Sequence, residues 1–250
     1  MITGIVVALP EELSTLTAKK IAKGCFGKIS DDILVICSGA GRENAQSAAE
    51  LLVAQGAGRL ISWGCAGALD AGLKPGDLML ATSCIDADQV VVDPHNEDWL
   101  AHGRACMGNH ALICIHTGRL AESKGIVATS QDKARLAQAT GAIAVDMESI
   151  AIARAAQKYG LPFLSIRAIA DPLNMDLPKA VSHALNHQGE VDLGKLLTYL
   201  VWHPTELLDL IKLGLYFNAA KKTLRKVANQ LDSLSVPPEH KKSQPNKNDK

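Results

Sequence analysis

Short apolar runs alternate along the chain with longer segments in which apolar residues recur every three or four positions. The short runs predict strands at 3–8, 33–38, 59–63, 77–86, 125–128, 142–145 and 162–170. The longer segments predict helices at 43–55, 131–139, 148–158 and 179–185. Because the strand segments are almost continuously apolar, the pattern favours an α/β protein whose sheet is buried on both faces.

The alternation ends near residue 191. Two amphipathic helices are expected at 192–202 and 205–230, and Pro204 between them cannot continue the first helix. The final residues are rich in Lys, Asn, Ser and Pro, a composition typical of disorder. The pattern therefore predicts a body over 1–188, a helical appendage over 189–232 and a disordered basic tail over 233–250.

The overall charge argues against a general nucleic-acid binder. The 250 residues include 26 Lys and Arg and 26 Asp and Glu, so the formal net charge is zero and a small-molecule partner is favoured. The charge is unevenly distributed, because residues 218–250 contain eight Lys or Arg and three Asp or Glu. The preceding body is consequently acidic.

Cysteine and histidine spacing gives no sign of a metal centre. The six cysteines form no CxxC pair and no zinc-type cluster, and the His183 and His187 pair lacks an acidic third ligand, so no metal is expected. The apolar N-terminal run has no basic flank, and no apolar run reaches about 18 residues. We therefore expect a cytoplasmic protein.

A glycine-rich segment at 38–44 follows the second predicted strand. Gly39 and Gly41 would direct backbone N–H groups toward an anion, to which Arg42 could add a positive charge. An ordinary tight turn fits the same residues. A dinucleotide site is disfavoured, since a third glycine and the acidic residue that would bind a ribose are missing.

A second glycine-rich segment, 63–69, is expected to form a turn after the third strand. Ligands of open α/β sheets bind at the carboxyl ends of strands, and Gly64 would let a substrate approach the backbone there. No histidine lies near Cys65 in the sequence to activate its thiol. A packing or backbone-donor role is therefore favoured for Cys65 over that of a nucleophile.

Three acidic residues lie at predicted strand ends. Asp146 and Glu148, on either side of Met147, could accept hydrogen bonds from sugar hydroxyls, or could instead stabilise the N-terminus of the following helix. Asp171 ends an apolar strand, where partial burial would raise its pKa toward that of a general acid. An Asp before a proline also often caps a turn.

Taken together, these segments resemble the purine nucleoside phosphorylase and methylthioadenosine/S-adenosylhomocysteine nucleosidase superfamily. The resemblance extends over about residues 1–175, through the motifs at 4–12, 38–41, 64–69, 73–77, 144–148 and 167–171. The segments 38–45 and 142–149, with the Leu-rich and then basic C-terminus, are most similar to the hopanoid-associated phosphorylase branch. That branch is associated with removing adenine from adenosylhopane.

The resemblance implies a single mixed, partly closed sheet flanked by helices, and a homodimer or higher homo-oligomer. It implies that Asp171 protonates or hydrogen-bonds adenine N7, and that Glu148 binds the ribose hydroxyls with Met147 packed on the sugar. Glu12 matches the residue that orients the attacking water in the nucleosidases. Gly64, Cys65 and Asp146 would also border the substrate. No cofactor is implied. In a phosphorylase, phosphate would be the co-substrate, and Arg42 with Gly39 and Gly41 would be its binding site.

Several positions depart from the superfamily pattern. Cys65 and Ala170 replace serines, and Ser62 replaces a phosphate-binding arginine. The segment 128–132 lacks the aromatic residue that stacks on adenine in the nucleosidases. Neither the phosphate site nor the base-stacking residue can therefore be transferred directly.

The leading hypothesis is an enzyme that cleaves the N-glycosidic bond of a 5′-substituted adenosine, such as adenosylhopane, by phosphorolysis. A hydrolytic nucleosidase is the first alternative, and a nucleoside-binding module without catalysis is the second. The basic amphipathic stretch over 191–232 could contact an anionic membrane surface, or could pack against the body or a partner subunit.

Overall fold

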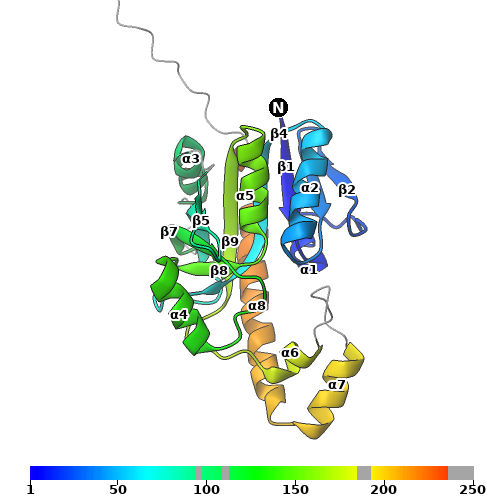
Figure 1. Ribbon diagram of the computed structural model, residues 1–250. Helices are drawn as coiled ribbons and strands as arrows, with labels where there is room; N and C mark the ends of the chain where they lie inside the picture. Colours follow the sequence, from blue (N-terminus) through cyan, green and yellow to red (C-terminus); the bar gives the residue numbers. More distant parts are fainter. Residues whose placement is uncertain (94–96, 109–112, 185–192, 236–250) are drawn as a thin grey trace, which may run out of the picture.

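The computed structural model describes residues 1–93, 97–108, 113–184 and 193–235 (Figure 1). Its strands are β1 (Ile2–Val7), β2 (Phe26–Ser30), β3 (Ile33–Cys37), β4 (Ala57–Ala68), β5 (Leu78–Ile85), β6 (Val91–Val92), β7 (Ile115–Glu122), β8 (Ala144–Asp146) and β9 (Phe163–Asp171). Its helices are α1 (Pro10–Leu13), α2 (Arg42–Ala54), α3 (Glu97–Gly108), α4 (Ser130–Thr140), α5 (Ser149–Lys158), α6 (Lys179–Ala184), α7 (Leu193–Trp202), α8 (Glu206–Ala228) and α9 (Leu231–Leu234).

The strands form one mixed sheet that is partly closed. The order is β2-β3-β1-β4-β8-β7-β5-β6, and β9 pairs with both β4 and β5. Because β9 joins β5 back to β4, the strands β4, β8, β7, β5 and β9 complete a ring. The α/β class and the mixed, partly closed sheet expected from the sequence are confirmed.

Alternate residues of the central strands point to opposite faces of the sheet. In β1, Val6 packs in the core beneath α2 and α5, whereas Ile5 and Val7 pack in the core beneath α3 and α8. Figure 1 shows α2 and α5 side by side over one face. Burial on both faces explains why these strands are continuously apolar.

The sequence pattern did not predict β2, β7 or α3, nor the short elements α1, β6 and α9, and one predicted strand was wrong. Residues 125–128 form no strand; the strand of that region is β7, which has polar residues such as His116 and Arg119 among its apolar ones. The edge strand β2 is largely polar and only partly buried, so it has no apolar run. The helix α3 was also not predicted; its buried positions Trp99, Gly103 and Met107 have helical spacing, but the middle one is a glycine and adds no apolar side chain to the pattern.

The predicted turn after residue 63 was also wrong. Residues Gly64 to Ala68 continue β4, with Gly64 paired to Arg167 of β9 and Gly67 paired to Val145 of β8. The glycines of this segment therefore do not reverse the chain. They leave space beside the strand for side chains from its neighbours.

The C-terminal helices are present as predicted, and α8 connects them to the body. In its second half Ala220, Leu224 and Val227 are buried in the same core cluster as Trp63, and Thr223 Oγ1 donates to the carbonyl of Gly76 at 2.6 Å. Figure 1 shows α7 and the first half of α8 extending away from the sheet. We call this part, 193–216, the projecting hairpin. The expected disordered tail lies, from residue 236 onward, outside the described residues, as do 185–192 with His187.

Candidate active site

Glu12 lies at the carboxyl end of β1, in the short helix α1. Its buried carboxylate accepts hydrogen bonds from the backbone N–H groups of Ala8 (3.2 Å) and Leu9 (3.1 Å) through Oε2. The N–H of Cys65 in the parallel neighbour β4 donates to Oε1 at 2.7 Å. The backbone thus holds this carboxylate in one position, and Cys65 contributes its N–H group to the site.

Arg167, from β9, lies at the centre of the site with only 2% of its surface exposed. Its Nη2 is 2.7 Å from Oδ2 of the buried Asp146, which ends β8. The guanidinium also donates to the hydroxyls of Ser149 (2.8 Å) and Ser62. One buried cation therefore links β9, β8, β4 and the first turn of α5.

Gly64 makes room for two of these groups. A Cβ atom at this position would lie 2.4 Å from Nη1 of Arg167 and 2.5 Å from Oε1 of Glu12. Both distances are far below van der Waals contact. The position therefore requires glycine because charged side chains occupy the space beside it, although its backbone is ordinary strand.

Glu148 completes the first group of charges. Its Oε1 accepts a hydrogen bond from the N–H of Gly41 at 2.8 Å, and the left-handed backbone of Gly41 (φ 97°) directs that group inward. Burial, with a further contribution from Asp146, raises the pKa of Glu148 from its ordinary 4.5 to about 7. Burial also raises the pKa of Glu12, and the nearby Arg167 opposes that rise.

A second charged group surrounds Asp171, which ends β9 and is paired with Gly67 of β4. Lys133 of α4 donates to the Asp171 carboxylate and to the carbonyls of Pro172 and Met175, both at 3.0 Å. Burial raises the pKa of Asp171, and the Lys133 ammonium opposes that rise. A Cβ on Gly67 would lie 3.2 Å from both carboxylate oxygens, so a second glycine of β4 adjoins this acid.

Lys133 is a residue of this group that the sequence pattern did not predict. With 1% of its side chain exposed, it lies on the inward stripe of α4 with Leu136, Ala137 and Thr140 at helical spacings of three, four and seven. A lysine on the apolar face of a predicted helix could have indicated this group, because a buried ammonium requires a partner of opposite charge or a set of acceptors. It lies directly after 128–132, where the aromatic residue is absent.

Two donors of the predicted phosphate site already contact carboxylate side chains of the protein. Arg42 Nε lies 3.3 Å from Oε1 of Glu122, whose side chain is 2% exposed, and the Gly41 N–H is bonded to Glu148. Among the described residues, Nη2 of Arg42 is buried without a hydrogen-bond partner. Met147 is half-buried between Asp146 and Glu148.

The sequence profile of the Phosphorylase superfamily matches residues 3–203, which include every residue of both charged groups. The chain belongs to this superfamily. The resemblance stated from the motifs is thereby confirmed at the level of the superfamily. No curated protein sequence matches the chain.

Solved structures of the superfamily have the same fold. The chain is 20% identical to 5′-methylthioadenosine/S-adenosyl homocysteine nucleosidase from Helicobacter pylori, with a TM-score of 0.67 over 93% of this chain and 96% of that one. For futalosine hydrolase of H. pylori strain 26695 the identity is 19%, the TM-score 0.67 and the coverages 93% and 96%. For the nucleosidase from Colwellia psychrerythraea 34H in complex with adenine, the values are 20%, 0.68, 94% and 96%.

Replacing Gly64 by alanine should disrupt the first charged group. The added Cβ would overlap Arg167 and Glu12, so we expect Gly64→Ala to displace both side chains and to lower kcat/KM for a substrate bound there at least about 100-fold. Gly103→Ala is the matched control, since its Cβ would meet ordinary contacts at 3.6 Å and more. Equal activity of the two variants would contradict the crowding of Arg167 and Glu12 around Gly64.

Glu148→Gln should change the pH dependence of stability. The pKa of Glu148 is 4.5 in the unfolded chain and about 7 in the folded protein, so the folded state holds the proton more tightly. The folding free energy that Glu148 contributes therefore falls by about 2–3 kcal/mol as the pH rises through this range. The amide does not ionise. We expect urea unfolding to show Glu148→Gln gaining that amount over wild type between pH 5 and pH 8, whereas exposed Glu43→Gln should show no such gain.

Proposed function

We propose that the protein is an enzyme that cleaves the N-glycosidic bond of a 5′-substituted adenosine and releases adenine. The main support is the arrangement of two charged groups along one strand. Gly64, beside Glu12 and Arg167, and Gly67, beside Asp171, are three residues apart on β4, a separation of about 10 Å. That length suits a nucleoside whose sugar lies at the first group and whose base lies at the second.

The first group is suited to the sugar and the nucleophile. A carboxylate at Glu148 can accept hydrogen bonds from two adjacent ribose hydroxyls, and carboxylates around C1′ stabilise the positive charge that develops on the sugar as the C–N bond lengthens. Glu12, held by three backbone donors and with its pKa raised by burial, can take a proton from an attacking water.

The second group is suited to the leaving base. As the bond between C1′ and N9 breaks, its electron pair moves into the purine ring, and N7 becomes basic enough to take a proton. Asp171, with its raised pKa and its short contact to the Lys133 ammonium, can supply that proton. Lys133 would act by holding Asp171 in place.

Water is the nucleophile that the charges favour. The Gly41 N–H and the Arg42 guanidinium face Glu148 and Glu122, and three carboxylates surround Arg167, so a phosphate dianion would meet net negative charge. Phosphorolysis is the second candidate. It is supported by the buried Nη2 of Arg42, which lacks a hydrogen-bond partner among the described residues.

An apolar 5′ substituent, as in adenosylhopane, is supported by the projecting hairpin. Trp202 of α7 is 78% exposed, and Leu208, Ile211 and Leu215 of α8 are exposed at positions that share one face of the helix. Exposed Lys222 and Lys226 continue that face toward the body. Apolar residues at the tip followed by cations suit an anionic membrane surface, from which a lipid-linked nucleoside would be taken.

The hairpin also lies at the appropriate end of the sheet. After Asp171 the chain passes through α6 into the hairpin, and Figure 1 shows the hairpin beyond the end at which α1 follows β1. None of the helices in the described part of the chain is both long and apolar enough to cross a bilayer. Contact through the hairpin would therefore be peripheral.

Product analysis tests the reaction. We expect purified protein to release adenine and the free 5-substituted ribose from methylthioadenosine or adenosylhopane equally with and without phosphate. A ribose 1-phosphate product would replace hydrolysis by phosphorolysis, and tight binding without turnover would indicate a binding module.

Asp171→Asn should lower kcat at least about 100-fold, whereas exposed Asp232→Asn should not.

Vesicle flotation tests the membrane contact. Trp202→Glu and Leu208→Glu should each weaken binding to phosphatidylglycerol vesicles at least about tenfold, because each replaces an exposed apolar side chain that would enter the membrane surface with a carboxylate. Phe26→Glu, at an exposed position on β2, is the matched control. Equal flotation of all variants would contradict the proposal.

The homo-oligomer implied by the resemblance is tested on the same variants by light scattering, where a mass halved by Trp202→Glu would assign the hairpin to a subunit interface.

A further inference from the structure

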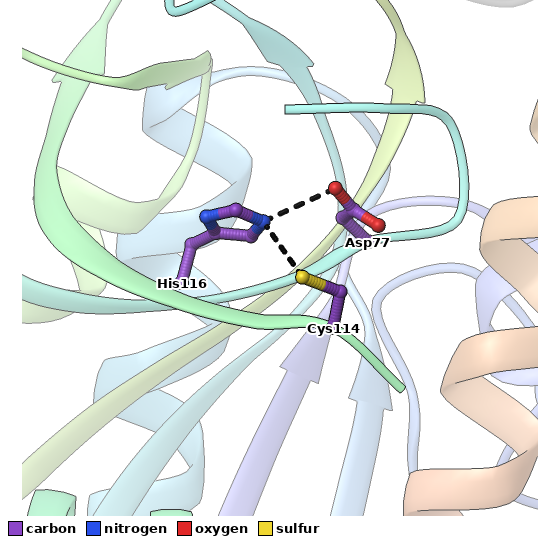
Figure 2. Close-up of side chains that lie close together, drawn as sticks. All are labelled: Asp77, Cys114 and His116. Carbon is purple, nitrogen blue, oxygen red and sulfur yellow. Dashed lines mark hydrogen bonds and ion pairs between the residues drawn. The ribbon is translucent and has the colours of Figure 1, made fainter. Parts of the chain in front are cut away.

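Three side chains of different chemistry converge beside the amino-terminal ends of β5 and β7 (Figure 2). Nε2 of His116 lies 3.1 Å from Oδ2 of Asp77 and 3.3 Å from Sγ of Cys114. Cys114 and His116 are two residues apart on an extended segment, so their side chains project to the same side. Asp77 immediately precedes Leu78, which pairs with Ile115 in the parallel ladder between β5 and β7.

This geometry differs from that of a nucleophilic Cys–His–Asp triad. In such a triad the nucleophile contacts one ring nitrogen of the histidine, and the acid contacts the other. Here Asp77 and Cys114 both approach Nε2, as the dashed lines in Figure 2 show. The acid therefore cannot orient the imidazole toward the thiol. Instead, the oxygen, nitrogen and sulfur atoms lie within 4.8 Å of one another, each available as a ligand.

We propose that Asp77, Cys114 and His116 bind a divalent transition-metal ion, for which Zn²⁺ is the best match. A thiolate, an imidazole and a carboxylate are its usual ligands, and three protein ligands leave the fourth tetrahedral position to water. Bonds of about 2.0–2.3 Å in a tetrahedron put ligand atoms roughly 3.3–3.6 Å apart. The three atoms lie within 4.8 Å of one another, so small side-chain movements would complete the site.

Coordination releases one proton, because the Cys114 thiol must become a thiolate while His116 binds through the lone pair of Nε2. The Nδ1 atom then holds the ring proton. All three side chains are partly or fully exposed, so an ion can reach them from solvent. Affinity should fall as the pH is lowered, since protons compete for the sulfur and the nitrogen.

The bound ion would stabilise a junction of the fold. The turn before β5 is joined to β9 by hydrogen bonds from Gly76 N to Ile169 O (2.8 Å) and from Ile169 N to Asp77 O (2.9 Å). Thr223 of α8 donates to the carbonyl of Gly76. A metal held by Asp77 would therefore fix this turn against β7. It would also resist separation of β9 and α8 from the turn. Metal binding at these three residues would be independent of the proposed nucleoside chemistry.

Cobalt titration of the full chain, reduced and treated with a chelator, tests the site. We expect one equivalent of Co²⁺ to produce thiolate-to-metal charge-transfer absorption in the near ultraviolet together with the visible bands of tetrahedral Co²⁺. Zn²⁺, which prefers the same tetrahedral site, should abolish both. Cys114→Ser should abolish the charge-transfer band. His116→Gln and Asp77→Asn should each weaken binding at least about tenfold.

The matched control is Cys106→Ser. Cys106 also lies 3.3 Å from a histidine nitrogen, that of His102, but belongs to no such three-ligand group among the described residues. It should retain the full cobalt spectrum. As a second measurement, Zn²⁺ should raise the Tm of wild type and of Cys106→Ser but not that of Cys114→Ser. Absence of a charge-transfer band in wild type, or its persistence in Cys114→Ser, would overturn the proposal.

Discussion

The buried charge of Arg167 is the constraint on which the rest of the site depends. An uncompensated charge in a protein interior costs several kcal/mol, so a guanidinium that is 2% exposed requires partners at fixed positions. Asp146 supplies the ion pair, and Ser62 and Ser149 supply acceptors. Each partner comes from a different element, so satisfying one cation fixes how β4, β8, β9 and α5 meet. The glycine at position 64 is a consequence of the same crowding.

The two charged groups also differ in the charges that surround their acids. The carboxylates around Arg167 influence one another, as the raised pKa of Glu148 beside Asp146 indicates. Asp171 instead has Lys133 as its main charged neighbour. The protonation of one group can therefore change with little effect on the other. This independence suits a reaction in which one proton is taken up while another is supplied.

Much of the fold could be predicted from the sequence, because strands such as β1, β3 and β9 are buried on both faces and are therefore apolar throughout. Strand ends also identified Asp146, Glu148 and Asp171, since polar residues after an apolar run are conspicuous. Other features depend on contacts between distant segments and leave no local pattern. The β7 strand has polar positions, Lys133 is buried only because Asp171 and two carbonyls meet it, and Cys114 and His116 have no recognisable ligand spacing without Asp77.

The way in which Glu12 is held has an evolutionary consequence. All three of its hydrogen-bond donors are backbone N–H groups, from Ala8, Leu9 and Cys65. Substitution of a side chain by any residue except proline leaves such a donor intact. Selection on the orientation of Glu12 therefore acts weakly on the identities of residues 8, 9 and 65, which are constrained instead by how their side chains pack. A cysteine can occupy position 65 for this reason, while the carboxylate beside it keeps its geometry.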